Sequence, residues 1–216
     1  MFNFAFMKVM NYSEKQLKII SAAETLFSNQ GYDGTSVRDI ADYAHVNVAM
    51  ISYYFGSKEK LMEAIFEQRT QTLSDKIELL LKDTTLNPFR KIEIVIEDYV
   101  ERVVEKHKFF KLMICEQMLE KNNSIHHLLK RLKTSNLELI GKLIEDGQQK
   151  KVFRKDIDVA LLMNTLMGTS MQTFSNADFY RQYYNLEEIS MKDYHEILQQ
   201  KLSKHIKEVF KAIIMI

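Results

Sequence analysis

The chain contains very few residues that interrupt helices. One proline and six glycines are spread over 216 residues. No strong alternation of apolar and polar residues marks half-buried strands, whereas apolar residues recur at the three- and four-residue spacing of amphipathic helices. Hydrophobic residues make up 46% of the chain and charged residues 27%, which suffices for a sizeable core. We therefore predict an all-α fold of about nine helices.

The charge and cysteine content narrow the possible partners and compartments. Because the formal net charge is +1, any contact with nucleic acid must be local. The single cysteine, Cys115, excludes an internal disulfide framework and suits a reducing compartment. The longest uncharged run, residues 159–177, contains too many polar side chains for a membrane span. We therefore expect a cytoplasmic protein with no membrane partner.

The first ten residues, MFNFAFMKVM, are apolar but lack the charged leader and cleavage site of a signal peptide. We expect residues 1–10 to form a flexible N-terminal arm, and whether they belong to the native start stays open.

Capping residues mark where the helices begin and end. Hydroxyl and amide side chains favour N-caps, and glycine favours the position after a helix. The predicted N-caps are Ser13, which opens a capping box with Gln16, and Thr35, Asn47 and Ser57, and the predicted terminating glycines are Gly31 and Gly56. Pro88 suits the first turn of a helix. Further helices are expected at about 108–120, 124–149, 156–177 and 191–214.

Two short predicted helices, Val37 to Tyr43 and Asn47 to Tyr54, are joined by a tight turn and form a helix-turn-helix unit. At about 100° per residue, one face of the second helix carries Val48, Ile51 and Phe55, which are expected to face the core. Ala49 and Tyr53 lie on the opposite side, with Met50 and Ser52 beside them. This outer face predicts a contact with something outside the subunit.

Residues 22–66, AAETLFSNQGYDGTSVRDIADYAHVNVAMISYYFGSKEKLMEAIF, resemble the tetracycline-repressor (TetR) family of transcriptional regulators. The matching pieces are the Leu-Phe before Gly31, the step at 34–36, the pair at 40–41, the turn exit at 46–47 and the run YYFGSKEKL. The family commonly has glycine where this chain has His45, at a position that often needs a positive φ. The detailed resemblance covers about one fifth of the chain.

The resemblance implies a DNA-binding domain over residues 11–58 and an effector-binding and dimerisation domain over 59–216. The implied DNA-binding residues are Thr35, Ser36, Arg38, Asn47, Val48, Ala49, Met50, Ser52, Tyr53, Tyr54 and Lys58. Among these, Thr35, Ser36, Tyr54 and Lys58 are expected at phosphates, and Arg38 at a phosphate or a guanine edge. An ion pair with Asp42 is the alternative for Arg38.

The C-terminal helices carry two further expectations. Flexible methionines and aromatics suit an adaptable ligand cavity, although core packing is the default for such residues. The candidate ligand-binding residues are Tyr99, Val103, Phe110, Met113, Met118, Met167, Met171 and Phe174. The resemblance favours a homodimer built as a four-helix bundle from the last two helices, with core packing again as the alternative. The candidate dimer residues are Gly168, Ile197, Leu198, Leu202, Ile206, Val209 and Phe210.

Metal and catalytic sites find little support in the sequence. His126 and His127 point about 100° apart on a helix and, with Cys115, lack zinc-ligand spacing. Asp156 and Asp158 are explained by a helix start. Cys115 lies among apolar residues and is expected to be a buried thiol. No nucleophile–base pair or phosphate-binding glycine loop is present, so we expect neither a metal, a cofactor nor an enzyme.

Together these observations predict a homodimeric transcriptional regulator, most simply a repressor, that binds a pseudo-palindromic double-stranded operator. An unidentified apolar or amphipathic small-molecule effector is expected to release it by favouring a conformation that no longer fits the DNA. The alternative is a helical protein-interaction module without a DNA-binding role. The operator, the regulated genes and the sign of regulation stay open.

Overall fold

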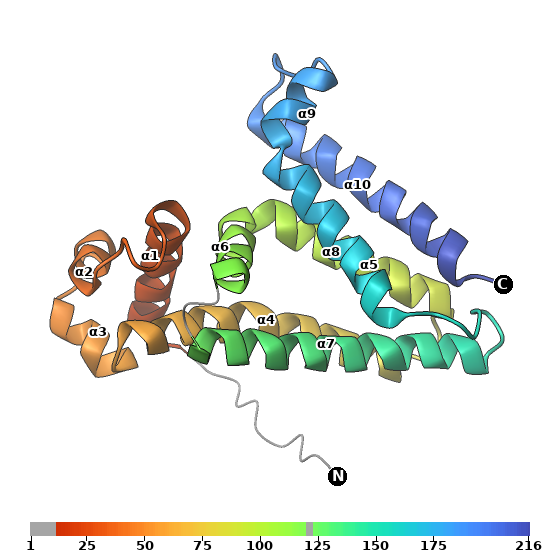
Figure 1. The fold of residues 1–216 in the computed structure, drawn as a ribbon, viewed down its shortest axis with the longest axis horizontal. Helices are drawn as coiled ribbons and strands as arrows, with labels where there is room; N and C mark the ends of the chain where they lie inside the picture. The colour runs from red at the N-terminus through yellow and green to blue at the C-terminus, as the bar shows by residue number, and fades with distance from the viewer. Residues whose placement is uncertain (1–11, 120–122) are drawn as a thin grey trace, which may run out of the picture. The chain divides into compact units, whose positions relative to one another are not determined.

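The computed structural model of the chain describes residues 12–119 and 123–216. Within these ranges it contains ten helices (Figure 1), which confirms the all-α prediction. They are α1 (Glu14–Gln30), α2 (Val37–Ala44), α3 (Val48–Phe55), α4 (Lys58–Lys82), α5 (Pro88–Glu105), α6 (His107–Leu119), α7 (Asn123–Gln149), α8 (Val159–Ser175), α9 (Ala177–Tyr183) and α10 (Met191–Ile214). The short α9 was not predicted, and the expected arm at residues 1–10 lies outside the described residues.

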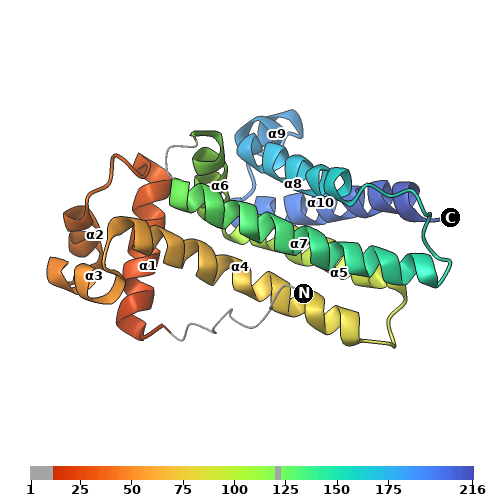
Figure 2. The ribbon, with the colours of Figure 1, turned by 60° about the horizontal axis from the view of Figure 1, so that its bottom comes forward.

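The helices form two compact units. The first holds the described residues up to Thr72 together with Lys111–Leu129, and the second holds Leu73–Phe110 and Lys130–Ile216. In the first unit α2 packs against both α1 and α3, and in the second α5, α8 and α10 pack against one another (Figure 2). The long helix α4 contributes residues to both units.

Most helix ends follow the local signals in the sequence. Ser13 and Gln16 form the predicted capping box, and the Asn47 side chain accepts a hydrogen bond from the Ala49 N–H at 2.8 Å. The Ser57 hydroxyl caps α4 by accepting from the Lys60 N–H at 3.1 Å. Asp158 rather than Asp156 caps α8, because its carboxylate accepts from the backbone of the first turn.

The apolar stripe of α10 is largely part of the subunit core. Leu198, Leu202, Ile206 and Phe210 are each at most 5% exposed, because α10 packs along α5 and α8. These four residues were predicted at a dimer interface, but the alternative of intramolecular packing is correct for them. Of the other predicted interface residues, Gly168 is exposed and Ile197 and Val209 are half-buried.

Cys115 is exposed, so the expectation of a buried thiol is wrong. Its apolar neighbours on α6, Leu112 and Met113, are buried, so Cys115 lies on a different face of the helix. His126 and His127 are also exposed. In the part of the chain that the structure describes, no group of three or more His, Cys, Asp or Glu side chains could hold a metal ion. None of the described helices is long and apolar enough to cross a membrane.

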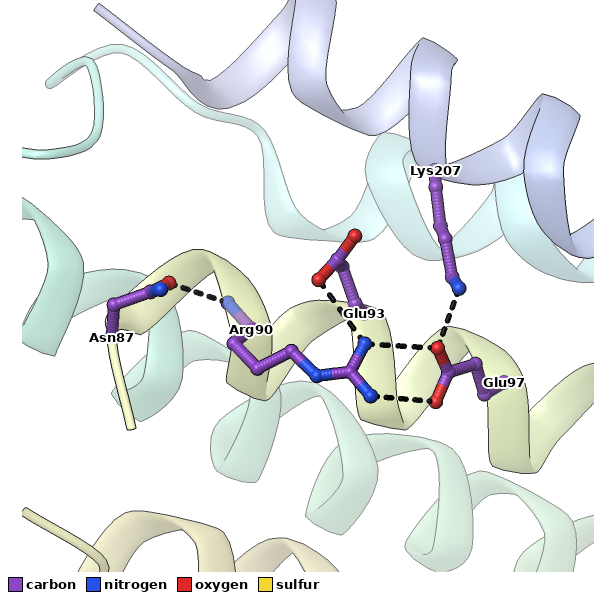
Figure 3. Close-up of polar contacts among 5 residues, drawn as sticks. All are labelled: Asn87, Arg90, Glu93, Glu97 and Lys207. Atoms are coloured by element: carbon purple, nitrogen blue, oxygen red, sulfur yellow. Dashed lines mark hydrogen bonds and ion pairs between the residues drawn. The ribbon is translucent and has the colours of Figure 1, made fainter. Parts of the chain in front are cut away.

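Ion pairs join α5 to α10 in the second unit (Figure 3). The Glu97 carboxylate accepts from the Arg90 guanidinium at 3.0 Å and from the Lys207 ammonium on α10. Arg90 also donates to Glu93 at 3.2 Å. Burial raises the pKa of Glu97, but the hydrogen bonds from Lys207 and Arg90 outweigh it, so the pKa lies below its ordinary value. The charged form of Glu97 is therefore the one that stabilises the packing of the two helices.

Glu97→Gln should lower the free energy of unfolding by about 1 kcal/mol at neutral pH, because the pairs are partly exposed and screened. A carboxylate whose pKa is depressed on folding stabilises above its unfolded pKa and loses that contribution as the pH falls through the folded value. The difference from the native chain should therefore vanish as urea unfolding is repeated from neutral pH down to about pH 3. Glu93→Gln removes only one longer contact, and an equal loss in both variants would contradict the assignment.

Candidate DNA-binding site

The turn between α2 and α3 has the geometry that a helix-turn-helix requires. His45 has φ 54° and ψ 47°, in the left-handed region, as expected for this position. Its N–H donates to the Asp42 carbonyl at 3.1 Å, and the Val46 N–H donates to the Ala41 carbonyl at 3.0 Å. These bonds end α2 and turn the chain so that Asn47 can begin α3 three residues later.

Helix α3 is held by one edge and leaves the other free. Ile51 is 1% exposed and anchors the helix, with Phe55 half-buried behind it. On the other side Ala49 and Ser52 are exposed, and Tyr53 is 83% exposed. Val48 was predicted to face the core, but it is 43% exposed, because it is the first residue of α3 and lies three positions before the buried Ile51. Val48 therefore adds to the outer face.

The start of α2 differs from the prediction by one residue. Ser36, not Thr35, is the N-cap: its hydroxyl accepts from the Asp39 N–H at 3.1 Å, and its own N–H donates to the Asp39 carboxylate at 2.7 Å. Hydrogen bonds from Ser36 lower the pKa of Asp39. Thr35 is buried, and its hydroxyl donates to the Gly31 carbonyl at 2.9 Å. The Thr35 side chain is thus turned inward, away from any phosphate.

Arg38 is exposed on α2, and it forms no ion pair with any residue that the structure describes. The alternative of an intrahelical pair with Asp42 is therefore not realised. The guanidinium is available to a partner outside the subunit.

Lys58 does more than present a charge at the surface. Its ammonium donates to the Tyr32 carbonyl at 2.8 Å and to the Thr35 carbonyl at 2.9 Å, and it lies 4.0 Å from the centre of the Tyr32 ring. Burial and the nearby Glu59 raise the pKa of Tyr32 to about 12, so the ring stays neutral. Lys58 thereby fastens the start of α4 to the loop between α1 and α2. This contact was not predicted, because Lys58 is 26 positions from Tyr32 and 23 from Thr35.

An ion pair also connects α4 to α1. The Arg69 guanidinium donates twice to the Glu24 carboxylate of α1, at 2.5 and 3.0 Å. The Glu24 side chain is only 9% exposed and that of Arg69 is 26% exposed. Because the two residues are 45 positions apart, their pairing was not predicted. The first part of α4 is thus bound to α1 and to the loop before α2.

The predicted ligand-binding residues have mixed environments. In the second unit, Tyr99, Val103 and Phe110 are buried at the junction of α5 and α6, where the Tyr99 and Phe110 rings meet edge to face at 5.6 Å. Met171 is buried and Met167 and Phe174 are half-buried on α8. In the first unit, Met113 is buried, whereas Met118 is 81% exposed and so does not line an interior.

One polar atom stands out in this apolar group. The Tyr99 hydroxyl is buried and has no hydrogen-bond partner among the described residues. Burial raises the pKa of Tyr99, so the hydroxyl stays protonated and able to donate. A buried hydroxyl without a partner is costly, and such groups commonly have a ligand or water partner.

Comparison with known proteins agrees with this arrangement. Residues 19–65 match the model of the bacterial regulatory proteins, tetR family, and residues 88–203 match the tetracyclin repressor-like C-terminal domain. The HTH-type transcriptional repressor NicS of Pseudomonas putida is 33% identical over 171 residues, covering 74% of each chain.

Solved structures share the fold over nearly the whole chain. The ketosteroid transcriptional regulator KstR2 of Mycobacterium tuberculosis has a TM-score of 0.68 at 18% identity, covering 95% of this chain and 97% of its own. The regulator FadR of Bacillus subtilis, solved in complex with stearoyl-CoA, has a TM-score of 0.66 at 20% identity, covering 89% and 96%. With the family matches and the exposed helix α3, these comparisons show that the chain belongs to the tetR family and is a DNA-binding transcriptional regulator.

Proposed function

We propose that the protein is a homodimeric, cytoplasmic repressor that binds a pseudo-palindromic operator through α2 and α3 and is released by a small apolar or amphipathic effector. The observation that carries the DNA-binding part is the outer face of α3, where Tyr53 is 83% exposed although α3 is packed through Ile51. A helix held at one edge and bare at the other has the shape that enters a major groove.

Contacts to the DNA phosphates are assigned to the start of α2 and to Tyr54 of α3. The N-terminus of α2 favours anions, although the Asp39 carboxylate already occupies the Ser36 N–H, which leaves Ser36 less free to hold a phosphate. Arg38 is exposed two residues further on, in the first turn of α2, and forms no ion pair with any described residue. Tyr54 is half-buried beside Tyr53, with ring centres 5.1 Å apart, and its hydroxyl is the second candidate for a phosphate.

Arg38→Ala should lower affinity for an operator selected from random duplexes by roughly tenfold or more. If Arg38 contacts a guanine, Arg38→Ala lowers the affinity only for duplexes that contain the G·C pair contacted by Arg38. If it contacts a phosphate, the loss is uniform across sequences and the salt slope falls by about 1. Fluorescence anisotropy over a salt series measures both quantities. Lys18→Ala, on the exposed side of α1, serves as the matched control, and an equal loss there would remove Arg38 from the interface.

The effector part of the proposal rests on Tyr99. Its partnerless hydroxyl lies among apolar side chains, so a ligand with a long apolar body and one hydrogen-bond acceptor would complete this region. FadR of Bacillus subtilis, which shares the fold, was solved with stearoyl-CoA, and this supports an acyl compound as the first probe. We assign no cofactor, no metal and no enzymatic activity to the protein.

Stearoyl-CoA and free stearate should each be titrated into the operator complex at fixed salt. Release by either compound at micromolar levels supports the acyl class, and Tyr99→Phe should then weaken release without changing operator affinity. If neither compound changes operator binding, the acyl assignment is wrong while the DNA-binding role stands.

The dimer is assigned to the outer faces of α8 and α10. Leu161 on α8 is 63% exposed and Ile213 on α10 is 42% exposed. Gly168, in the interior of α8, is exposed as well. Two-fold symmetry of such a dimer would dictate the symmetry of the operator. Analytical ultracentrifugation should find a dimer for the native chain and for Leu79→Glu, which changes an exposed leucine of α4, and a monomer for Leu161→Glu/Ile213→Glu. A native monomer would contradict the assignment.

Helix α4 is the part we assign to signal transmission. Its Arg69 pairs with Glu24 in the first unit, and its Lys76 pairs with the buried Asp98 in the second. The two basic residues, Arg69 and Lys76, are seven positions apart on the same helix, and each pairs with a carboxylate of its own unit. An effector that favours one position of α4 over another would shift the population of DNA-competent molecules.

A further inference from the structure

The outer face of α3 lacks the side chains that usually read purines. Its exposed residues are Val48, Ala49, Ser52 and Tyr53, and Met50 is half-buried beside them. Helix α3, VAMISYYF, contains no arginine, lysine, asparagine or glutamine. Asn47 precedes it, but its carbonyl oxygen is already used to cap the Ala49 N–H. The helix thus presents methyl groups, one aromatic ring and two hydroxyls.

The major groove offers a limited set of partners to such a surface. Guanine is usually recognised by two hydrogen bonds from arginine or lysine, and adenine by two from asparagine or glutamine. An apolar side chain has one specific partner there, the C5-methyl group of thymine. Hydroxyls bond to several bases and discriminate poorly among them.

The aromatic side chains of α3 are arranged to present Tyr53 firmly. The Tyr53 and Tyr54 rings meet edge to face at 5.1 Å, and Tyr54 meets Phe55 in the same way at 6.4 Å. Phe55 and Tyr54 are half-buried and Tyr53 is exposed, so the three rings in contact lead from the packed side of α3 to its exposed side. A ring supported in this way loses little rotational freedom when it packs against a base.

We propose that α3 recognises its half-site through thymine methyl groups, with Tyr53 as the main specificity-determining residue and Val48 and Ala49 beside it. The inference rests on the proposed DNA-binding role and specifies the chemistry that the site reads. Base pairs facing α3 are then A·T, with thymine methyls directed at Tyr53, and Arg38 on α2 is the residue placed to read a guanine outside this segment.

The test uses the unmodified chain of 216 residues and operators selected from random duplexes at one salt concentration. Each thymine in the half-site is replaced by deoxyuridine, which removes only the methyl group. Affinity should fall about fourfold for each contacted methyl, and roughly 16-fold when the same change is made in both half-sites. Deoxyuridine in the flanking DNA, beyond the footprint, should leave the affinity unchanged.

Two variants separate the ring from its hydroxyl. Tyr53→Phe keeps the ring and should keep the full deoxyuridine penalty, whereas Tyr53→Ala should lose the penalty at one base step and keep it elsewhere. Should Tyr53→Ala bind too weakly to measure, the penalties of the native chain and Tyr53→Phe decide the question.

Three results would overturn the inference. Native affinity within twofold for fully thymine and fully deoxyuridine half-sites would refute methyl readout while operator binding stands. Selected half-sites with G·C pairs throughout the segment under α3 would refute it equally. Failure to select any sequence above non-specific binding would remove the proposed function together with the inference.

Discussion

Arg69→Ala is expected to lower the free energy of unfolding of the first unit by about 4 kcal/mol. The substitution leaves the Glu24 carboxylate, only 9% exposed, without the two hydrogen bonds that it receives from the guanidinium. A buried charge that loses its partner keeps its desolvation cost. Urea unfolding followed by circular dichroism, with hydrogen exchange of the α1 amides, measures the loss and locates it in the first unit.

The matched control removes both charges together. Glu24→Gln/Arg69→Met leaves no uncompensated ion and should recover at least half of the lost stability, since a buried ion pair adds little beyond an apolar replacement. A loss below 1 kcal/mol for Arg69→Ala, or no recovery in the double variant, would show that the pair does not fasten α4 to α1.

Lys58→Met is expected to cost about 3 kcal/mol of stability and to weaken operator binding. The ammonium donates to two loop carbonyls, those of Tyr32 and Thr35, and methionine of similar length can donate to neither. The loop leads directly into the Ser36 cap and Arg38, so its loosening should misplace the DNA-facing part of α2. Urea unfolding and operator anisotropy on the same preparation measure the two effects.

Lys60→Met supplies the control from the same turn of α4. Lys60 is 65% exposed and pairs with Glu63 three residues away, so its loss should cost less than 1 kcal/mol. If Lys58 were a phosphate contact alone, Lys58→Met would lower operator affinity and salt dependence but leave unfolding unchanged. That outcome would contradict the structural role assigned to the ammonium.

Local signals predicted the helices of the DNA-binding unit well. The capping box at Ser13, the cap at Asn47 and the glycines at 31 and 56 act within a few residues, so the sequence alone contains the interaction. The prediction of Thr35 as the N-cap of α2 was wrong by one residue, because Thr35 and Ser36 are both hydroxyl residues before the same helix and the cap is Ser36. The choice depends on which side chain the loop turns inward, and Thr35 turns toward the Gly31 carbonyl.

Long-range contacts were beyond such reasoning. The pairing of Arg69 with Glu24 and the hydrogen bonds of Lys58 depend on how α4 crosses the elements before it, which periodicity does not specify. The apolar stripe of α10 shows the same limit, since Leu198 and Phe210 suit a dimer and a subunit core equally well by pattern. Periodicity identifies an apolar face but not the element that covers it.

Tyr53 and Lys58 have to be changed separately when the DNA-binding role is tested. A variant lacking both Tyr53 and Lys58 would combine a surface change with a folding defect, because Lys58 holds the loop before α2. Tyr53→Ala alone is the better probe, since an 83% exposed ring contributes little to the core. Tyr183→Ala, which removes a 70% exposed tyrosine of α9 in the second unit, is its matched control.

The most direct test is the ratio of affinities for a selected operator and its scrambled duplex at one salt concentration. The native chain and Tyr183→Ala should prefer the operator by roughly a thousandfold or more. In Tyr53→Ala this ratio should be at least tenfold lower, while helicity and sedimentation stay unchanged. A native chain that binds both duplexes alike, or a Tyr53→Ala variant with the full preference, would contradict the assignment of α3 as the reading helix.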